Sequence, residues 1–253
     1  MLFVAWQDAR SRRWFPVGRL WREDGEYRFG YIEGFREAEK EAGFMPLLPF
    51  PRVDEIYHSS KLFPSFGNRI MNPSRVELSD YLDRLGLAPG GDLEELGFDI
   101  LARGQGRRAT DSLELFPHPL VSTEEGSKYR LELFVHGLRH QPESARARAE
   151  ALEVGEQIYL MPDPQNPHDR HAVALRSEDR HVLGYLPRYH GRDVGALLAS
   201  EAEVAVEVLR VNPSPAPPGH RLLVRVEADW PFDRSPLDAE IYALVASARS
   251  RAS

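Results

Sequence analysis

The sequence contains no cysteine among its 253 residues. This absence excludes disulfide bonds, thiolate nucleophiles and cysteine-based zinc sites, so any metal site would have to use His, Asp or Glu. The chain also has no apolar run near the roughly 18 residues that a membrane-spanning helix requires. Its first residues lack the basic stretch and long apolar segment of a secretory signal. We therefore expect a cytoplasmic globular protein.

An excess of positive charge is missing as well. The chain has 32 Lys and Arg residues against 39 Asp and Glu residues, and its formal net charge is -7. Proteins that coat duplex DNA through its phosphates carry a basic surface. This balance argues against non-specific duplex binding, but it leaves room for a small local pocket that holds one nucleic-acid end.

Familiar catalytic motifs are absent too. The sequence has no Gly-x-Ser-x-Gly elbow, and "RGQGRR" lacks the lysine and the following hydroxyl of a Walker loop. We expect a protein that is not an enzyme and that uses no cofactor.

The N-terminal half combines strand and helix patterns. Asp24-Gly25 separates two runs of aromatic and β-branched residues, which predicts a hairpin. Residues 59–105 are predicted to be helical, and "DSLELFP" after them is strand-like. A polar, turn-rich stretch follows at residues 120–128. We predict an α+β domain over residues 1–119, in which a small sheet packs with helices.

The C-terminal half consists mostly of strand patterns. The predicted strands lie in "YRLELFVHGL", "EQIYLM", "HAVALR", "HVLGYL", "EVAVEVLRV" and "HRLLVRVEA". Two helical segments interrupt them, "PESARARAEAL" and "GRDVGALLAS". Many short strands separated by turns are typical of a small β-barrel, which we predict over residues 129–230. A helical tail is predicted over residues 231–253.

One loop of this half, "MPDPQNPHDRHAVAL", gathers Pro, Asn, Asp and His between two strands. As a stiff turn, its Asn and Asp side chains would bond their own backbone while Pro fixes the path of the chain. As a metal site it would use His168, Asp169 and His171, although the familiar spacing of two His one helical turn apart is missing. A metal-dependent hydrolase is the hypothesis that we rank last.

Three separated motifs occur in this half in a fixed order: "FVHGLRH", "LEVGEQIYLMPDPQNPHDRHAVAL" and "HVLGYLPR". With these motifs, residues 129–230 resemble a HIRAN domain. The resemblance implies a small OB-like β-barrel that binds single-stranded DNA at its 3′ end, as in eukaryotic fork-remodelling enzymes. It also implies a link to DNA repair.

The resemblance implies specific nucleic-acid-binding residues. Arg139 matches the arginine of the first strand that contacts the DNA end, and His140 follows it where the family has an aromatic residue. Asn166 and Asp169 match the Asn-Pro-x-Asp motif, and Asp169 would accept a hydrogen bond from the terminal hydroxyl. His168 replaces the aromatic residue inside that motif.

Two further residues of the "GYLPR" strand end, Tyr185 and Arg188, would line the same pocket. The residue types agree with this function, because guanidinium groups bind phosphate by paired hydrogen bonds and flat rings stack on unpaired bases.

The N-terminal half resembles the N-terminal lobe of HipA-type kinases more weakly. The segments concerned are "VGRLWREDGEYRFGYI", "LFPSFGNRIMNPSRVELSDYLDRLGL" and "DILARGQGRRATDSLELFP". The resemblance implies a protein-docking domain without a kinase active site. The alternative function is therefore a protein-interaction or antitoxin-like partner of a HipA-type kinase, with no binding of DNA ends.

Overall fold

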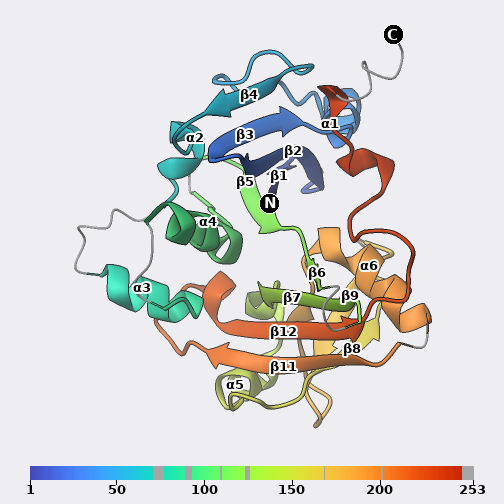
Figure 1. Ribbon diagram of the computed structural model, residues 1–253. Helices are drawn as coiled ribbons and strands as arrows, with labels where there is room; N and C mark the ends of the chain where they lie inside the picture. Colours follow the sequence, from blue (N-terminus) through green and yellow to red (C-terminus); the bar gives the residue numbers. More distant parts are fainter. Residues whose placement is uncertain are drawn as a thin grey trace. The chain divides into compact units, whose positions relative to one another are not determined.

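The computed structural model describes residues 1–70, 77–88, 93–108, 110–122, 126–167, 169–200 and 202–246 (Figure 1). The chain forms two compact units. The N-terminal unit comprises Met1–Leu78, Pro89–His118 and Leu237–Ser253, and the C-terminal unit comprises Ser79–Ala88 and Pro119–Pro236.

The N-terminal unit is built on one antiparallel five-stranded sheet with the order β4-β3-β2-β1-β5. Its strands are β1 (Leu2–Gln7), β2 (Trp14–Glu23), β3 (Glu26–Tyr31), β4 (Ile56–Ser59) and β5 (Leu113–Pro117). Asp24 and Gly25 join β2 to β3 with φ angles of 53° and 79°, which confirms the predicted hairpin. Both residues lie in the left-handed region that such two-residue turns require.

Helices α1 (Gly34–Ala42), α2 (Pro64–Gly67) and α4 (Leu93–Gly104) complete this unit. Its core contains a cluster of aromatic rings. The ring centroids of Phe29 and Phe50 lie 4.2 Å apart, and those of Phe29 and Phe66 lie 5.5 Å apart. The expected sheet with helices is therefore confirmed.

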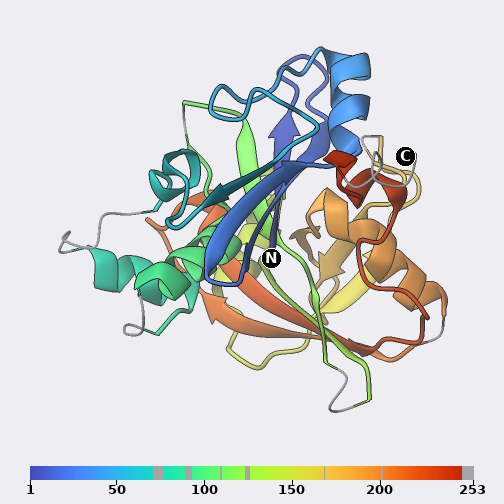
Figure 2. The same ribbon diagram turned by 45° about the horizontal axis from the view of Figure 1, so that its top comes forward.

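The C-terminal unit contains two antiparallel sheets, with the orders β11-β12-β7-β6 and β10-β9-β8. Their strands are β6 (Leu120–Ser122), β7 (Lys128–Phe134), β8 (Tyr159–Pro162), β9 (Val173–Arg176), β10 (Val182–Tyr185), β11 (Val204–Val211) and β12 (Leu222–Asp229). The long strands β11 and β12 run side by side (Figure 1 and Figure 2).

Single bridges connect the two sheets, between His136 and Tyr185 and between Gln157 and Glu207. Over the described residues, strand pairing gives two sheets and no continuous closed ladder, so closure of the predicted small OB-like β-barrel is not confirmed. Alternate side chains of both sheets are nevertheless buried in one core, among them Leu131, Leu175 and Val224.

Short helices surround the sheets of the C-terminal unit: η1 (Leu138–His140), α5 (Glu143–Glu150), α6 (Arg188–Ala199) and η2 (Pro218–His220). Helices α5 and α6 confirm the two predicted helical segments. Helix α3 (Leu78–Leu85), which comes from the N-terminal half of the sequence, also contacts β11 and the segment that follows it. Asp83 pairs with Arg210 at 2.9 Å, and the Arg84 carbonyl accepts a hydrogen bond from Asn212.

The described part of the C-terminal tail has one short helical turn, η3 (Glu240–Tyr242), and an antiparallel bridge between Leu244 and Ile32. Within the described ranges, every helix is too short or too polar to cross a membrane.

Candidate nucleic-acid interface

The loop between β8 and β9 is held by side chains that bond to its own chain. The Asn166 amide donates to Asp163 Oδ2 at 3.1 Å, and Asn166 Oδ1 accepts the backbone N–H of Asp169 at 3.3 Å. Asp169 Oδ1 accepts the backbone N–H of His171 at 2.9 Å. These bonds confirm the predicted stiff turn, since Asn and Asp side chains here replace the partners that a strand would supply.

The second oxygen of Asp169 faces a cation. Arg188 Nε lies 3.5 Å from Asp169 Oδ2, which is an ion pair that is too long for a strong hydrogen bond. The Asp169 side chain is 13% exposed and that of Arg188 is 36% exposed. One carboxylate oxygen is thus committed to the loop backbone, while the other lies beside a half-exposed guanidinium.

The approach of α6 to this loop depends on a glycine. Arg188 is the first residue of α6, and Gly191 lies one turn further along. A Cβ atom on Gly191 would lie 2.4 Å from the carbonyl oxygen of His171. The missing side chain therefore lets the first turn of α6 pack on the loop, which holds Arg188 near Asp169.

Tyr185 lies at the end of β10 and reaches the same loop. Its hydroxyl donates to Asp163 Oδ2 at 3.1 Å. Burial, together with the hydrogen bond to Asp163, raises the pKa of Tyr185, so the hydroxyl remains a donor at neutral pH. Two backbone hydrogen bonds with His136, of 2.9 and 2.8 Å, fix the strand end.

Asp163 is a site residue that the sequence motifs did not reveal. It accepts hydrogen bonds from both Tyr185 and Asn166 through the same oxygen. Its position directly after β8 and before a proline was the available signal, because Asp-Pro after a strand favours a turn.

Arg139 and His140 lie in η1, which follows Gly137 with its φ of 76°. Arg139 Nε donates to His140 Nε2 at 2.9 Å, and both side chains are exposed. A Cβ atom on Gly137 would lie 3.9 Å from Tyr185, so η1 starts beside the strand end that carries Tyr185.

Arg139 also lines a hollow of about 370 Å³ between η1, α5 and η2. Arg146 and Arg221 line it too, and Arg221 pairs with Glu150 at 2.7 Å. For the Arg146 guanidinium we find neither an ion pair nor a hydrogen bond to any described residue. The Arg146 side chain is exposed.

The predicted site residues therefore form two groups. Asn166, Asp169, Tyr185 and Arg188 are connected through Asp163 and the loop backbone. Arg139 and His140 lie in η1, beside Tyr185. His168 lies outside the described residues, so the hypothesis of a metal site with His168, Asp169 and His171 has no described geometry. In the part of the chain that is described, no three His, Asp or Glu side chains are grouped to hold a metal ion.

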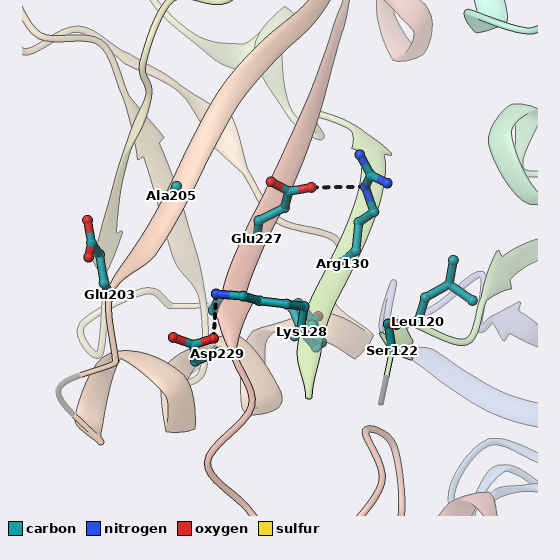
Figure 3. Close-up of a pocket in the computed structure, with 10 residues that line it drawn as sticks. Leu120, Ser122, Lys128, Arg130, Glu203, Ala205, Glu227 and Asp229 are labelled. Atoms are coloured by element: carbon teal, nitrogen blue, oxygen red, sulfur yellow. Dashed lines mark ion pairs between the residues drawn. The ribbon is translucent and has the colours of Figure 1, made fainter. Parts of the chain in front are cut away.

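A second hollow, of about 440 Å³, lies over the sheet formed by β11, β12, β7 and β6 (Figure 3). Lys128 pairs with Asp229 at 2.6 Å, and Arg130 pairs with Glu227 at 3.0 Å, as the dashed lines in Figure 3 mark. Both lysine and arginine are matched by acids of β12, and Glu203 adds a further negative charge. A phosphate here would have to displace carboxylates, so this face is a poor nucleic-acid surface.

The family model described as "HIRAN domain" matches residues 128–228. The HIRAN domain of human HLTF, a crystal structure, is 18% identical, with 39% of this chain and 74% of that chain covered and a TM-score of 0.32. A crystal structure of a protein from Lactobacillus plantarum is 19% identical, with 40% and 97% covered and a TM-score of 0.33. No curated protein matches. None of these findings bears out the resemblance of the N-terminal half to HipA-type kinases, which stays a prediction.

Proposed function

Because residues 128–228 form a HIRAN domain, we propose that this part of the chain binds single-stranded DNA at its 3′ end. The observation that carries the proposal is the convergence of an acceptor, a cation and a ring at one loop. These groups are Asp169, Arg188 and Tyr185. An unpaired strand end presents the matching features, namely a hydroxyl donor, a phosphate and a base.

Asp169 recognises the terminal hydroxyl in this proposal. Its Oδ1 is used by the His171 N–H, whereas Oδ2 has Arg188 at 3.5 Å and keeps lone pairs for a further donor. Arg188 binds the phosphate that precedes the terminal sugar, since guanidinium groups bind phosphate oxygens in pairs. A 3′ phosphate in place of the hydroxyl would bring negative charge against the carboxylate and would be rejected.

The remaining residues position or extend these contacts. Asp163 and Asn166 hold the loop, and Tyr185 offers its ring to the terminal base while its hydroxyl is fixed by Asp163. Arg139 binds a second phosphate and His140 stacks on a base. The role of His168, a stacking ring inside the motif, is also part of the proposal.

Fluorescence anisotropy with labelled oligonucleotides tests the proposal directly. The wild-type protein should bind a 3′-hydroxyl strand more tightly than its 3′-phosphate counterpart, by roughly tenfold or more, because a hydrogen bond to a charged group contributes about 1.5–3 kcal/mol. Asp169→Ala should abolish this preference. Asp229→Ala is the matched control, since it removes an exposed carboxylate of the same unit without touching the loop. Equal affinity of the wild-type protein for both ends would refute the proposal.

A second function, protein docking, is favoured by one observation on the N-terminal unit. Met45 and Leu48, in the segment after α1, are 73% and 96% exposed. Large apolar side chains exposed so close together are a feature of interaction surfaces. The predicted partner is a HipA-type kinase. Co-purification of a kinase with the wild-type protein, and its loss in the double variant Met45→Asp, Leu48→Asp, would support docking; retention of the kinase by that variant would contradict it.

A further inference from the structure

The outward face of β8 carries two large exposed side chains. Side chains alternate along a strand, so Ile158 and Leu160 point toward the core while Tyr159 and Met161 point away from it. Tyr159 is 45% exposed and Met161 is 41% exposed. Large apolar side chains that lie side by side in contact with water are a feature of binding surfaces. This face is therefore a candidate binding surface.

Strand register shows that this face continues to the loop site. Met161 pairs with Ala174 of β9, and Ala174 pairs with Tyr185 of β10. Residues directly opposite each other in a sheet place their side chains on the same face. Tyr185 therefore lies on the same face as Met161 and Tyr159, and Tyr159 lies further from the loop along β8.

Arg176 gives this face a positive charge. It pairs with Tyr159 across the two strands, and its guanidinium carbon lies 5.8 Å from the centroid of the tyrosine ring. Over the described residues, no ion pair of Arg176 with an acid is found. A ring with a neighbouring guanidinium suits an unpaired base and its phosphate better than it suits an apolar protein surface.

We propose that Tyr159 and Arg176 form a second subsite for the bound strand, in which Tyr159 stacks on an unpaired base upstream of the 3′ terminus. This inference rests on the proposed function. Tyr159 lies four residues before Asp163, or roughly 13 Å along an extended strand at about 3.3 Å per residue. The subsite thus contacts a nucleotide beyond the terminal one, and Met161 lies between the two subsites.

The first test compares variants by anisotropy with a 3′-hydroxyl oligonucleotide at fixed salt. Tyr159→Ala should weaken binding about tenfold, because stacking of a base on an aromatic side chain contributes about 1–3 kcal/mol. Tyr159→Phe keeps the ring and should bind like the wild-type protein. Val154→Ala, which shortens an exposed apolar side chain outside this face, is the control and should change nothing.

The second test uses the wild-type protein and strands that carry one abasic site at successive positions. An abasic site at one of the upstream positions should lower the affinity of the wild-type protein for the strand. The same abasic site should not lower the affinity of Tyr159→Ala any further. The preference for a 3′ hydroxyl over a 3′ phosphate should persist in Tyr159→Ala, since Asp169 is unchanged.

The outcomes separate this inference from the proposed function. If the wild-type protein prefers the hydroxyl end but Tyr159→Ala binds equally well, or if no upstream abasic position matters, the stacking subsite is wrong and end recognition stands. Equal losses in Tyr159→Phe and Tyr159→Ala would also overturn stacking. Absence of any oligonucleotide binding would overturn both.

Discussion

Replacement of Gly191 by Ala tests how α6 is held against the loop that carries Asp169. Gly191 lies within α6, one turn after Arg188, and its backbone faces the carbonyl oxygen of His171. The added Cβ atom would lie 2.4 Å from that oxygen, well inside the contact distance of real side chains. Helix and loop must therefore move apart in the variant.

The magnitude follows from two opposing terms. Overpacking a well-packed contact costs typically about 1–3 kcal/mol. Alanine in the middle of a helix is more favourable than glycine by about 0.5–1 kcal/mol, which offsets part of that cost. Gly195 of the same helix provides the control, because a Cβ atom there meets nothing within 4 Å. The difference between the two variants isolates the clash, at about 1–3 kcal/mol of unfolding free energy.

Urea unfolding followed by circular dichroism measures both variants. We expect the midpoint of Gly195→Ala above that of the wild-type protein and the midpoint of Gly191→Ala below that of Gly195→Ala. Separation of Arg188 from Asp169 should also weaken oligonucleotide binding in Gly191→Ala alone. Equal midpoints of the two variants would refute the close packing of α6 on the loop.

Two further predictions concern stability. The Tyr129 hydroxyl is buried without a hydrogen-bond partner among the described residues, so Tyr129→Phe should stabilise the protein by about 1 kcal/mol in urea unfolding at pH 7. Burial raises the pKa of Tyr129, so the tyrosine ionises first in the unfolded chain, and the wild-type protein loses stability as pH rises above about 10. Tyr129→Phe lacks this ionisable group and should lose less stability there. The hydrogen bond from Arg148 lowers the pKa of Glu156, so this pair stabilises the fold above a pH of about 4.5 and less as pH falls. In Arg148→Ala, the melting temperature should fall less steeply as pH drops below about 4.5. An unchanged dependence of the melting temperature on pH in this range would contradict the assignment.

Local patterns in the sequence were sufficient for most secondary structure. The Asp24-Gly25 turn has a conformation that few residue pairs adopt, and the predicted strands of the C-terminal half correspond to β7–β12. Helix α6 begins at Arg188, three residues before the predicted segment. Pro187 is the N-cap of α6 and has an extended backbone conformation. Tyr189 and His190 in the first turn are buried, so this turn packs with the rest of the helix.

Contacts between residues that lie far apart in the sequence could not be predicted from local patterns. The packing of α3 with β11 joins Asp83 to Arg210, which lie 127 positions apart, and no local period signals such a contact. The bond between Asp163 and Tyr185 spans 22 positions. The family motif pointed to Asn166 and Asp169 but gave no indication that a second acid, Asp163, would connect them to β10.

The shared oxygen of Asp163 has a dynamic consequence. Since Tyr185 and Asn166 both donate to Oδ2, release of either donor leaves the other bond without its geometric support. The end of β10 and the β8–β9 turn should then open together, and their backbone amides should exchange with solvent at a common rate. In the proposed complex, a DNA 3′ end bound at this turn would slow amide exchange in both segments at once.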